Sequence, residues 1–184
     1  MHFRLVIFKY FSIFILSFKK KFTFASIMSQ EKEEIIKILY VDDEVNNLNS
    51  FRATFRRDYE IYTAESATEG VKVLSEHDVD ILITDQRMPN MTGVEFLEKI
   101  IPIYPDPIRI LLTGYTDITA VVDAINKGQV YQYLNKPWVE SELRIIIKNA
   151  YEIHELRRQN KALTENLKKA NAQLEFLLRQ QLIS

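Results

Sequence analysis

The sequence predicts an α/β protein built on a five-stranded parallel sheet with helices on both faces. Two observations support this prediction. Five short apolar segments recur between residues 38 and 134, and each is followed by a stretch with the spacing of an amphipathic helix. The apolar segments are almost continuously hydrophobic, which is typical of strands buried on both faces. Strands that alternate with helices in this manner form parallel sheets.

Each element has its own local signal. The strands are expected at residues 38–41, 60–64, 81–84, 108–113 and 131–134. The helices are expected at about 46–57, after Ser66, at 94–101, from Asp117 to Gly128, and from about Glu140 onward. Ser66 and Glu69 have the spacing of a capping box. Pro102 and Pro105 end the third helix, because proline cannot continue one.

Four of the predicted strands end in polar residues. The first ends in Asp42 and Asp43, the third in Asp85, the fourth in Thr113 and the fifth in Lys136. Ligands of an open α/β sheet bind outside the carboxyl ends of the strands, which in the flavodoxin-like order means between the first and third strands. We therefore expect three carboxylates, a hydroxyl and an ammonium group to face one crevice.

These residue types together predict phosphoryl chemistry at a divalent cation. Neighbouring carboxylates repel each other unless a cation compensates them. Mg²⁺ takes oxygen ligands, uses one or two carboxylates and keeps several waters, which leaves room for a phosphoryl group. A carboxylate can attack phosphorus to form an acyl phosphate, and Lys136 and Thr113 would then stabilise charge on the transferred group.

Taken singly, the same residues have simpler explanations. Asp42 or Asp43 alone fits a helix N-cap. Asp85 alone fits an Asx turn at the exit of a strand, and Thr113 alone fits a strand-end hydroxyl. The presence of all five positions, in this order and at these strand ends, favours the phosphoryl-transfer interpretation.

The motifs at these positions resemble a known family. They are Asp42-Asp43, TDQRMP around Asp85, LLTGYTD around Thr113 and YLNKPW around Lys136. Together they resemble the receiver domain of bacterial two-component response regulators, over roughly residues 36–150. The resemblance implies a cytoplasmic signalling protein that catalyses only its own phosphorylation and dephosphorylation. A sensor histidine kinase or phosphotransfer protein would donate the phosphoryl group.

The resemblance also implies a set of metal ligands, with Mg²⁺ or Mn²⁺ as the cofactor. Asp85 resembles the phosphoacceptor, which also contacts the metal. Asp43 resembles the direct metal ligand, and Asp42 resembles its neighbour that acts largely through water. The main-chain carbonyl of Arg87 resembles a further ligand.

The remaining positions resemble the parts that respond to phosphorylation. Thr113 resembles the hydroxyl that senses the phosphoryl group, and Lys136 resembles the cation that pairs with it. Tyr133 resembles the aromatic residue that turns inward on phosphorylation. A tyrosine on a strand is also typical of packing or of the surface, and Tyr131 lies close by in the sequence.

The last helix is predicted to be much longer than a receiver domain needs. After Pro137 no proline or glycine interrupts it to about Leu182, and its apolar residues follow a heptad repeat. The a positions are Ile146, Ile153, Asn160, Leu167 and Leu174, and the d positions are Leu156, Leu163, Ala170 and Leu177.

This heptad repeat predicts that residues 151–184 form a parallel homodimeric coiled coil. Asn at an a position favours two in-register strands. Glu152 and Arg157 occupy g and e positions, where they can pair between chains. The alternatives are a helix folded back on its own domain and a polar stretch that is only partly ordered.

One short motif in this helix resembles a functional site but lacks the sequence context of that site. His154-Glu155-Leu156-Arg157 resembles the phosphoacceptor box of histidine kinases, but no proline follows it and no ATP-binding domain is present in the sequence. Because His154 falls on a b position of the heptad, we expect it to be a solvated surface residue.

Residues 1–35 differ in composition from the rest. Residues 1–27 carry a charge of +5 and many aromatic side chains, whereas residues 28–184 carry −6. A start assigned too early before Met28, a membrane-leaning segment and a signal peptide are the three explanations. The acidic body argues against direct nucleic-acid binding. The absence of cysteine excludes disulfides and thiol nucleophiles.

Two other functions remain open at this point. The chain could be the N-terminal part of a larger response regulator with a phosphodiesterase or transcription-activator output domain, since TDQRMP, LLTGYTD and YLNKPW are similar to such receivers. An Mg²⁺-dependent phosphohydrolase could use the same acidic site, but the expected loops are too short to form a substrate pocket. The downstream protein is not specified by the sequence.

Overall fold

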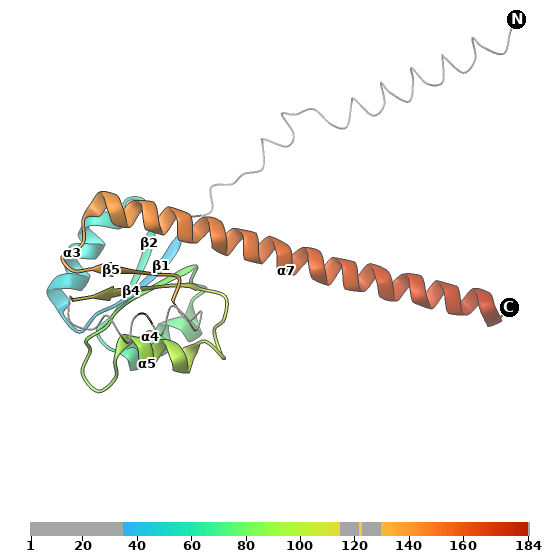
Figure 1. Cartoon of the computed structure of the whole chain (residues 1–184), viewed down its shortest axis with the longest axis horizontal. Helices are drawn as coiled ribbons and strands as arrows, with labels where there is room; N and C mark the ends of the chain where they lie inside the picture. The colour runs from blue at the N-terminus through green and yellow to red at the C-terminus, as the bar shows by residue number, and fades with distance from the viewer. Residues whose placement is uncertain (1–34, 115–121, 123–129, 184) are drawn as a thin grey trace, which may run out of the picture. The chain divides into compact units, whose positions relative to one another are not determined.

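The computed structural model describes residues 35–114, 122 and 130–183 (Figure 1). Its strands are β1 (Lys37–Val41), β2 (Glu60–Ala64), β3 (Ile81–Asp85), β4 (Ile108–Thr113) and β5 (Gln132–Asn135). Its helices are α3 (Val45–Phe55), α4 (Ala67–Glu76), α5 (Gly93–Ile100) and α7 (Glu140–Ile183). The helix that the sequence predicts between Asp117 and Gly128 lies outside the described residues.

The five strands form one parallel sheet in the order β2-β1-β3-β4-β5. The predicted flavodoxin-like arrangement is therefore confirmed. The register aligns the carboxyl ends of the central strands, with Val41 opposite Thr84 and Asp85 opposite Leu112. As a result, the polar residues that follow these strands lie at one edge of the sheet.

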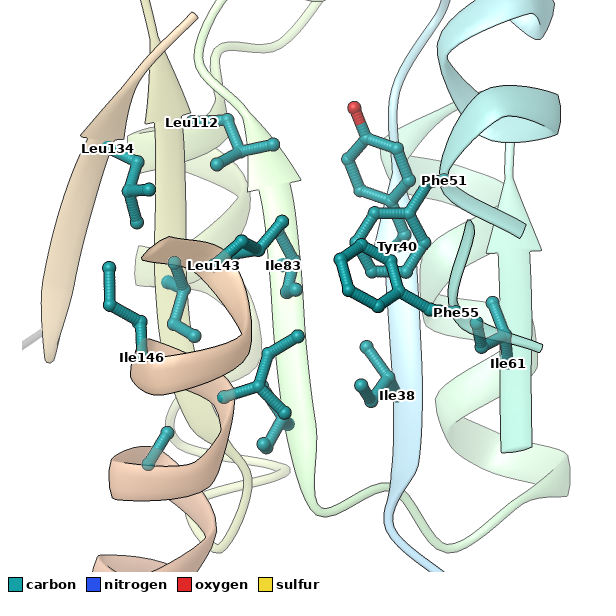
Figure 2. Packing of buried hydrophobic residues seen from close by; sticks show 14 of the residues in the cluster. Ile38, Tyr40, Phe51, Phe55, Ile61, Ile83, Leu112, Leu134, Leu143 and Ile146 are labelled. Carbon is teal, nitrogen blue, oxygen red and sulfur yellow. The ribbon is translucent and has the colours of Figure 1, made fainter. Parts of the chain in front are cut away.

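One face of the sheet is covered by α3 and α7 (Figure 2). Phe51 and Phe55 of α3 and Leu143 and Ile146 of α7 are buried in this cluster. The ring centroids of Tyr40 and Phe51 are 4.6 Å apart. A second cluster, on the opposite face, joins the strands to α4 and α5. Burial on both faces explains why the three central strands, β1, β3 and β4, are largely apolar.

Helices α4 and α5 both begin with the hydrogen bonds that satisfy free backbone N–H groups. Ser66 accepts a bond from the backbone N–H of Glu69, as its spacing predicts. At α5, Thr92 and Glu95 form a complete capping box, which was not among the predicted features. The turn before α5 contains Asn90 with a φ of 67°, a left-handed conformation that Asn tolerates.

Helix α7 belongs to the domain at one end and extends away from it at the other (Figure 1). Leu143, Ile146, Ile147 and Ala150 are buried, and Ile153 is partly buried against the same cluster. From Leu156 onward, the described side chains of α7 are exposed.

The heptad interpretation is therefore wrong for its first two a positions. Ile146 and Ile153 pack against the domain and are not free to form a seam with another helix. The exposed apolar stripe begins instead at Leu156, which is 58% exposed.

The expectation for His154 is also wrong. Its side chain is only 11% exposed, and Nδ1 lies 3.6 Å from Oδ1 of Asp80 at the start of β3. The reason is that Tyr151 and Ile153, on the same turn of α7, still pack against the domain. A heptad position alone cannot identify this contact.

Among the helices in the described part of the chain, none is both long enough and apolar enough to span a bilayer.

Candidate functional site

The site lies at the carboxyl edge of the sheet and is centred on Asp42. This residue follows β1 and is completely buried. Its carboxylate accepts hydrogen bonds from the Tyr40 hydroxyl, the backbone N–H of Glu44 and the side-chain amide of Asn47. The Asn47 and Glu44 donors both lie at 3.0 Å from Oδ1. Helix α3 therefore begins against a buried anion, which its positive N-terminal end also favours.

Lys136 joins the two buried carboxylates of the site. Its Nζ lies 2.7 Å from Oδ2 of Asp42 and also contacts Oδ1 of Asp85. The Lys136 side chain is 25% exposed, whereas that of Asp85 is 7% exposed. A single cation, reaching in from the chain after β5, thus compensates two carboxylates that would otherwise repel each other.

The two carboxylates respond differently to burial. Burial raises the pKa of Asp85 above its usual value, and the contacts with Lys136 only partly oppose this effect. Burial acts on Asp42 too, but bonds from Lys136, Tyr40, Asn47 and Glu44 outweigh it and hold the pKa of Asp42 below its usual value. Burial would lower the pKa of Lys136, but its pairing with Asp42 and Asp85 raises it overall.

Asp85 stands at the end of β3, where the chain turns sharply into α5. Its Oδ2 accepts a 2.6 Å bond from the backbone N–H of Arg87. The turn closes through a 3.0 Å bond from the Gly93 N–H to the Gln86 carbonyl, and Gln86 Oε1 accepts the Val94 N–H at 3.2 Å. These bonds hold the Asp85 carboxylate at the edge of the sheet, facing Lys136.

Thr113 and Lys136 come from neighbouring strands. The backbone N–H of Lys136 donates to the Thr113 carbonyl at 2.8 Å, which fixes the two residues side by side. Thr113 is buried, and its hydroxyl donates to the Gly114 carbonyl at 3.0 Å. The peptide bond between Lys136 and Pro137 is cis.

The other predicted site residues are more exposed than this centre. Asp43 is partly exposed, and Arg87 is exposed. Within residues 35–114, 122 and 130–183, no three acidic or histidine side chains converge in a set suited to a metal ion. Tyr133 is 39% exposed on β5, so its ring is not turned inward here.

Sequence reasoning missed Tyr40 and Asn47. Both hydrogen-bond to Asp42 from the positions that backbone geometry dictates. Tyr40 and Asp42 are two residues apart and share one face of an extended chain, while Asn47 lies in the first turn of α3. The alternation along β1 was the available signal, but a tyrosine in a buried strand is more often interpreted as packing.

Known proteins with similar sequences contain the same kind of domain. Residues 38–148 match the family model described as the response regulator receiver domain. The chain is 33% identical over 131 residues to the hydrogenase transcriptional regulatory protein HoxA of Bradyrhizobium diazoefficiens, which covers 71% of this chain and 27% of that protein. The chain thus spans about a quarter of the length of this curated relative.

Solved structures give the same result. A receiver domain protein from Clostridium thermocellum is 35% identical, with a TM-score of 0.63, covering 66% of this chain and 98% of that one. A structure described as adenylate cyclase from Rhodopirellula baltica is 32% identical, with a TM-score of 0.70, covering 72% and 98%. The fold and its acidic edge define a phosphorylation-dependent signalling domain. The chain belongs to the receiver domain family of response regulators.

Proposed function

We propose that Asp85 accepts a phosphoryl group from a phosphohistidine of a sensor histidine kinase or phosphotransfer protein. A carboxylate oxygen of Asp85 attacks phosphorus, an O–P bond forms and the P–N bond breaks. The donor imidazole nitrogen keeps the bonding electron pair. The observation that carries this proposal is the single ammonium of Lys136 between Asp42 and Asp85, since that cation is placed to pair with negative charge on the transferred group.

We assign the metal role to Asp43, Asp85 and the main-chain carbonyl of Arg87, with Asp42 acting largely through water. The donors are all oxygens, which suits Mg²⁺ or Mn²⁺. Two carboxylates and a carbonyl are also as many protein ligands as Mg²⁺ commonly takes. A bound cation would compensate negative charge on the phosphoryl group. Lys136 holds Asp42 and Asp85 in place on the other side of the site.

The response to phosphorylation is assigned to Thr113 and Tyr133. The Thr113 carbonyl accepts a hydrogen bond from the backbone N–H of Lys136. The Thr113 hydroxyl is therefore close to the position of the phosphoryl group once it no longer donates to the Gly114 carbonyl. Tyr133 lies on the neighbouring strand and is exposed, which leaves its ring free to turn inward. The outer surface of β5 changes as a result.

We propose that α7 pairs two copies of the chain in parallel, with a receiver at residues 36–150 and a coiled coil at 151–184. The support is a stripe of exposed leucines beyond the domain. The stripe consists of Leu156, Leu163, Leu167, Leu174 and Leu177, each between 56% and 66% exposed. Such a surface on a single helix is costly in water and is removed by pairing.

We assign the signalling output of the domain to a downstream effector that contacts α7 and β5. The curated relative is called a transcriptional regulatory protein, and this chain corresponds to about a quarter of it. We propose that this chain likewise acts on a downstream effector in the cytoplasm and does not bind nucleic acid through residues 36–184. Its own turnover is restricted to the acyl phosphate of Asp85, so it is a signalling protein and not an enzyme with a separate substrate.

Intact-protein mass spectrometry tests the phosphorylation site. The chain is incubated with acetyl phosphate and Mg²⁺, and the adduct of one phosphoryl group is followed over time. We expect the adduct in the unaltered protein and in Asp78→Asn, which changes an exposed carboxylate outside the site. We expect none in Asp85→Asn. An adduct of equal yield in Asp85→Asn would contradict the assignment.

Light scattering tests the dimer, with and without a beryllofluoride phosphoryl mimic. Leu163→Asp should give a monomer, because it places charge in the seam. Ala162→Asp is the matched control, since it changes the adjacent exposed residue at a c position. Equal masses for the two variants would exclude this seam. A mass that depends on the mimic, except in Asp85→Asn, would make dimerisation the output.

A further inference from the structure

A small pocket lies where α7 leaves the domain, at the edge of the sheet opposite the acidic site. Its volume is about 220 Å³, and its lining residues come from two segments. Pro105 and Asp106 belong to the connection between α5 and β4. The others belong to two successive turns of α7 and are His154, Arg157, Arg158 and Lys161.

The pocket is basic although residues 28–184 as a whole are acidic. It contains three permanent cations and one carboxylate, Asp106. A further guanidinium lies behind it, because the buried Arg109 donates to the carbonyls of Pro105 and Pro107 at 3.1 and 3.0 Å. Burial, and then the charge of Arg157, lower the pKa of Arg109, which places the two cations close together. Positive potential is therefore concentrated at this point.

The acidic side chains nearby compensate only part of this charge. Both carboxylate oxygens of Asp106 lie 3.1 Å from Nζ of Lys161, but both side chains are about two-thirds exposed, so the pair is weak. Arg158 pairs with Glu155 at 2.9 Å. Within the described part of the chain, Arg157 has no carboxylate at ion-pair distance and faces another cation.

A second feature of the pocket is the imidazole of His154. Nδ1 of His154 is buried and makes no hydrogen bond. The nearest carboxylate oxygens are Oδ1 of Asp80 at 3.6 Å and Oε1 of Glu155 at 3.8 Å, both too long for a good bond. Buried polar atoms without a partner are costly and uncommon. The pocket therefore holds one guanidinium without a carboxylate at ion-pair distance and, beside it, a buried imidazole nitrogen whose nearest carboxylates are too far away for a hydrogen bond.

We infer that this pocket binds a phosphate-type oxyanion, either free phosphate or the phosphate group of an ester. Guanidinium groups bind phosphate oxygens through paired, charge-assisted hydrogen bonds. The anion would supply acceptors to Arg157 and would compete with Asp106 for Lys161. Because it would contact both the α5–β4 connection and α7, it would hold the base of the helix to the domain.

The pocket residues lie beside the proposed dimer seam and not within it. They occupy the b, e and f positions of α7, whereas the seam uses a and d positions beginning at Leu156. Arg157 is at an e position, which flanks the seam, so an interchain pair with Glu152 would compete with the anion for its guanidinium. The inference does not depend on phosphorylation of Asp85, since the acidic crevice lies at the other edge of the sheet.

Isothermal titration calorimetry on the full chain tests the site, with inorganic phosphate and phenyl phosphate as separate probes. EDTA is present and the ionic strength is low, so that metal-dependent binding at the acidic edge does not contribute. Arg157→Gln should weaken binding about tenfold or more, as expected for the loss of a charge-assisted bond. Lys168→Gln removes an exposed cation of α7 outside the pocket and should leave binding within about twofold, as a surface change does.

Asp106→Asn should change the affinity for the anion in the opposite direction. It removes the carboxylate that competes for Lys161 and should tighten binding a few-fold. This result cannot come from partial unfolding, which would weaken binding. Binding of either probe with this pattern supports the site and identifies which source of phosphate it prefers. Absence of binding for both probes, or equal weakening by Arg157→Gln and Lys168→Gln, overturns the inference.

Discussion

Replacement of Gly93 by alanine should damage both the stability of the domain and the position of the phosphoacceptor. Gly93 begins α5 directly behind β3. A Cβ atom added there would overlap the main-chain oxygen of Asp85 and would lie 2.8 Å from Cδ1 of Leu111. Ordinary Cβ contacts are longer than 3.0 Å, so the backbone must move by about 1 Å to relieve the overlap.

The expected loss of stability follows from the groups that the added Cβ atom would overlap. Overpacking usually costs about 1–3 kcal/mol, and flexible side chains absorb part of it by rotating. The carbonyl of Asp85 cannot rotate away, because it belongs to a central strand. We therefore expect a loss of about 3 kcal/mol in the free energy of unfolding. The same displacement should slow acetyl phosphate-dependent phosphorylation by roughly ten- to a hundredfold.

Urea denaturation followed by circular dichroism measures the first effect, and intact-protein mass spectrometry measures the second. Gly114→Ala is the matched control, since among the described residues no atom outside its two chain neighbours lies within 4 Å of its added Cβ. It should remain within about 0.5 kcal/mol of the unaltered protein. If Gly93→Ala also stays within that range and is phosphorylated at the normal rate, the steric argument is refuted.

Three further predictions concern the buried ion pairs and a helix start. Lys136→Met should cost about 2–3 kcal/mol in urea denaturation without Mg²⁺, because it leaves the buried carboxylate of Asp42 without its cation. Adding Asp42→Asn should recover part of this loss, and no recovery would show that the unpaired carboxylate of Asp42 is not its cause. Thr92→Ala should cost about 1 kcal/mol, since it removes the cap of α5; an unchanged denaturation midpoint would contradict this. Hydrogen bonds from Thr92 lower the pKa of Glu95, so Glu95 stabilises the fold above its unfolded pKa, and this contribution is lost as pH falls through its folded pKa. Glu95→Gln should therefore be less stable than the unaltered protein at neutral pH, with the difference disappearing in acid; a difference that persists in acid would contradict the assignment.

The sequence by itself determined the fold class and the composition of the acidic edge. Strands buried on both faces must be apolar, and this requirement is visible as five separate runs. The residue that follows a parallel strand lies at the carboxyl edge of the sheet, and this does not depend on how distant parts of the chain pack. For that reason the amino-acid order alone is enough to place Asp42, Asp85, Thr113 and Lys136 together.

Which side chains contact one another at the site depended on the tertiary structure. The sequence places Lys136 at the edge, but only the relative position of β1, β3 and β5 decides that its ammonium contacts Asp42 and Asp85 together. Tyr40 and Asn47 lie only two and five residues from Asp42, but their hydrogen bonds to it depend on side-chain rotamers, which the amino-acid order alone does not fix.

The last helix separates local from tertiary information most clearly. A heptad repeat identifies which side chains share a face, but not what that face contacts. Ile146 and Ile153 have the spacing of a coiled-coil seam and yet pack against the domain, and His154 is buried beside Asp80. The apolar contacts between α7 and the domain end before Leu156, and where they end is a property of the assembled fold.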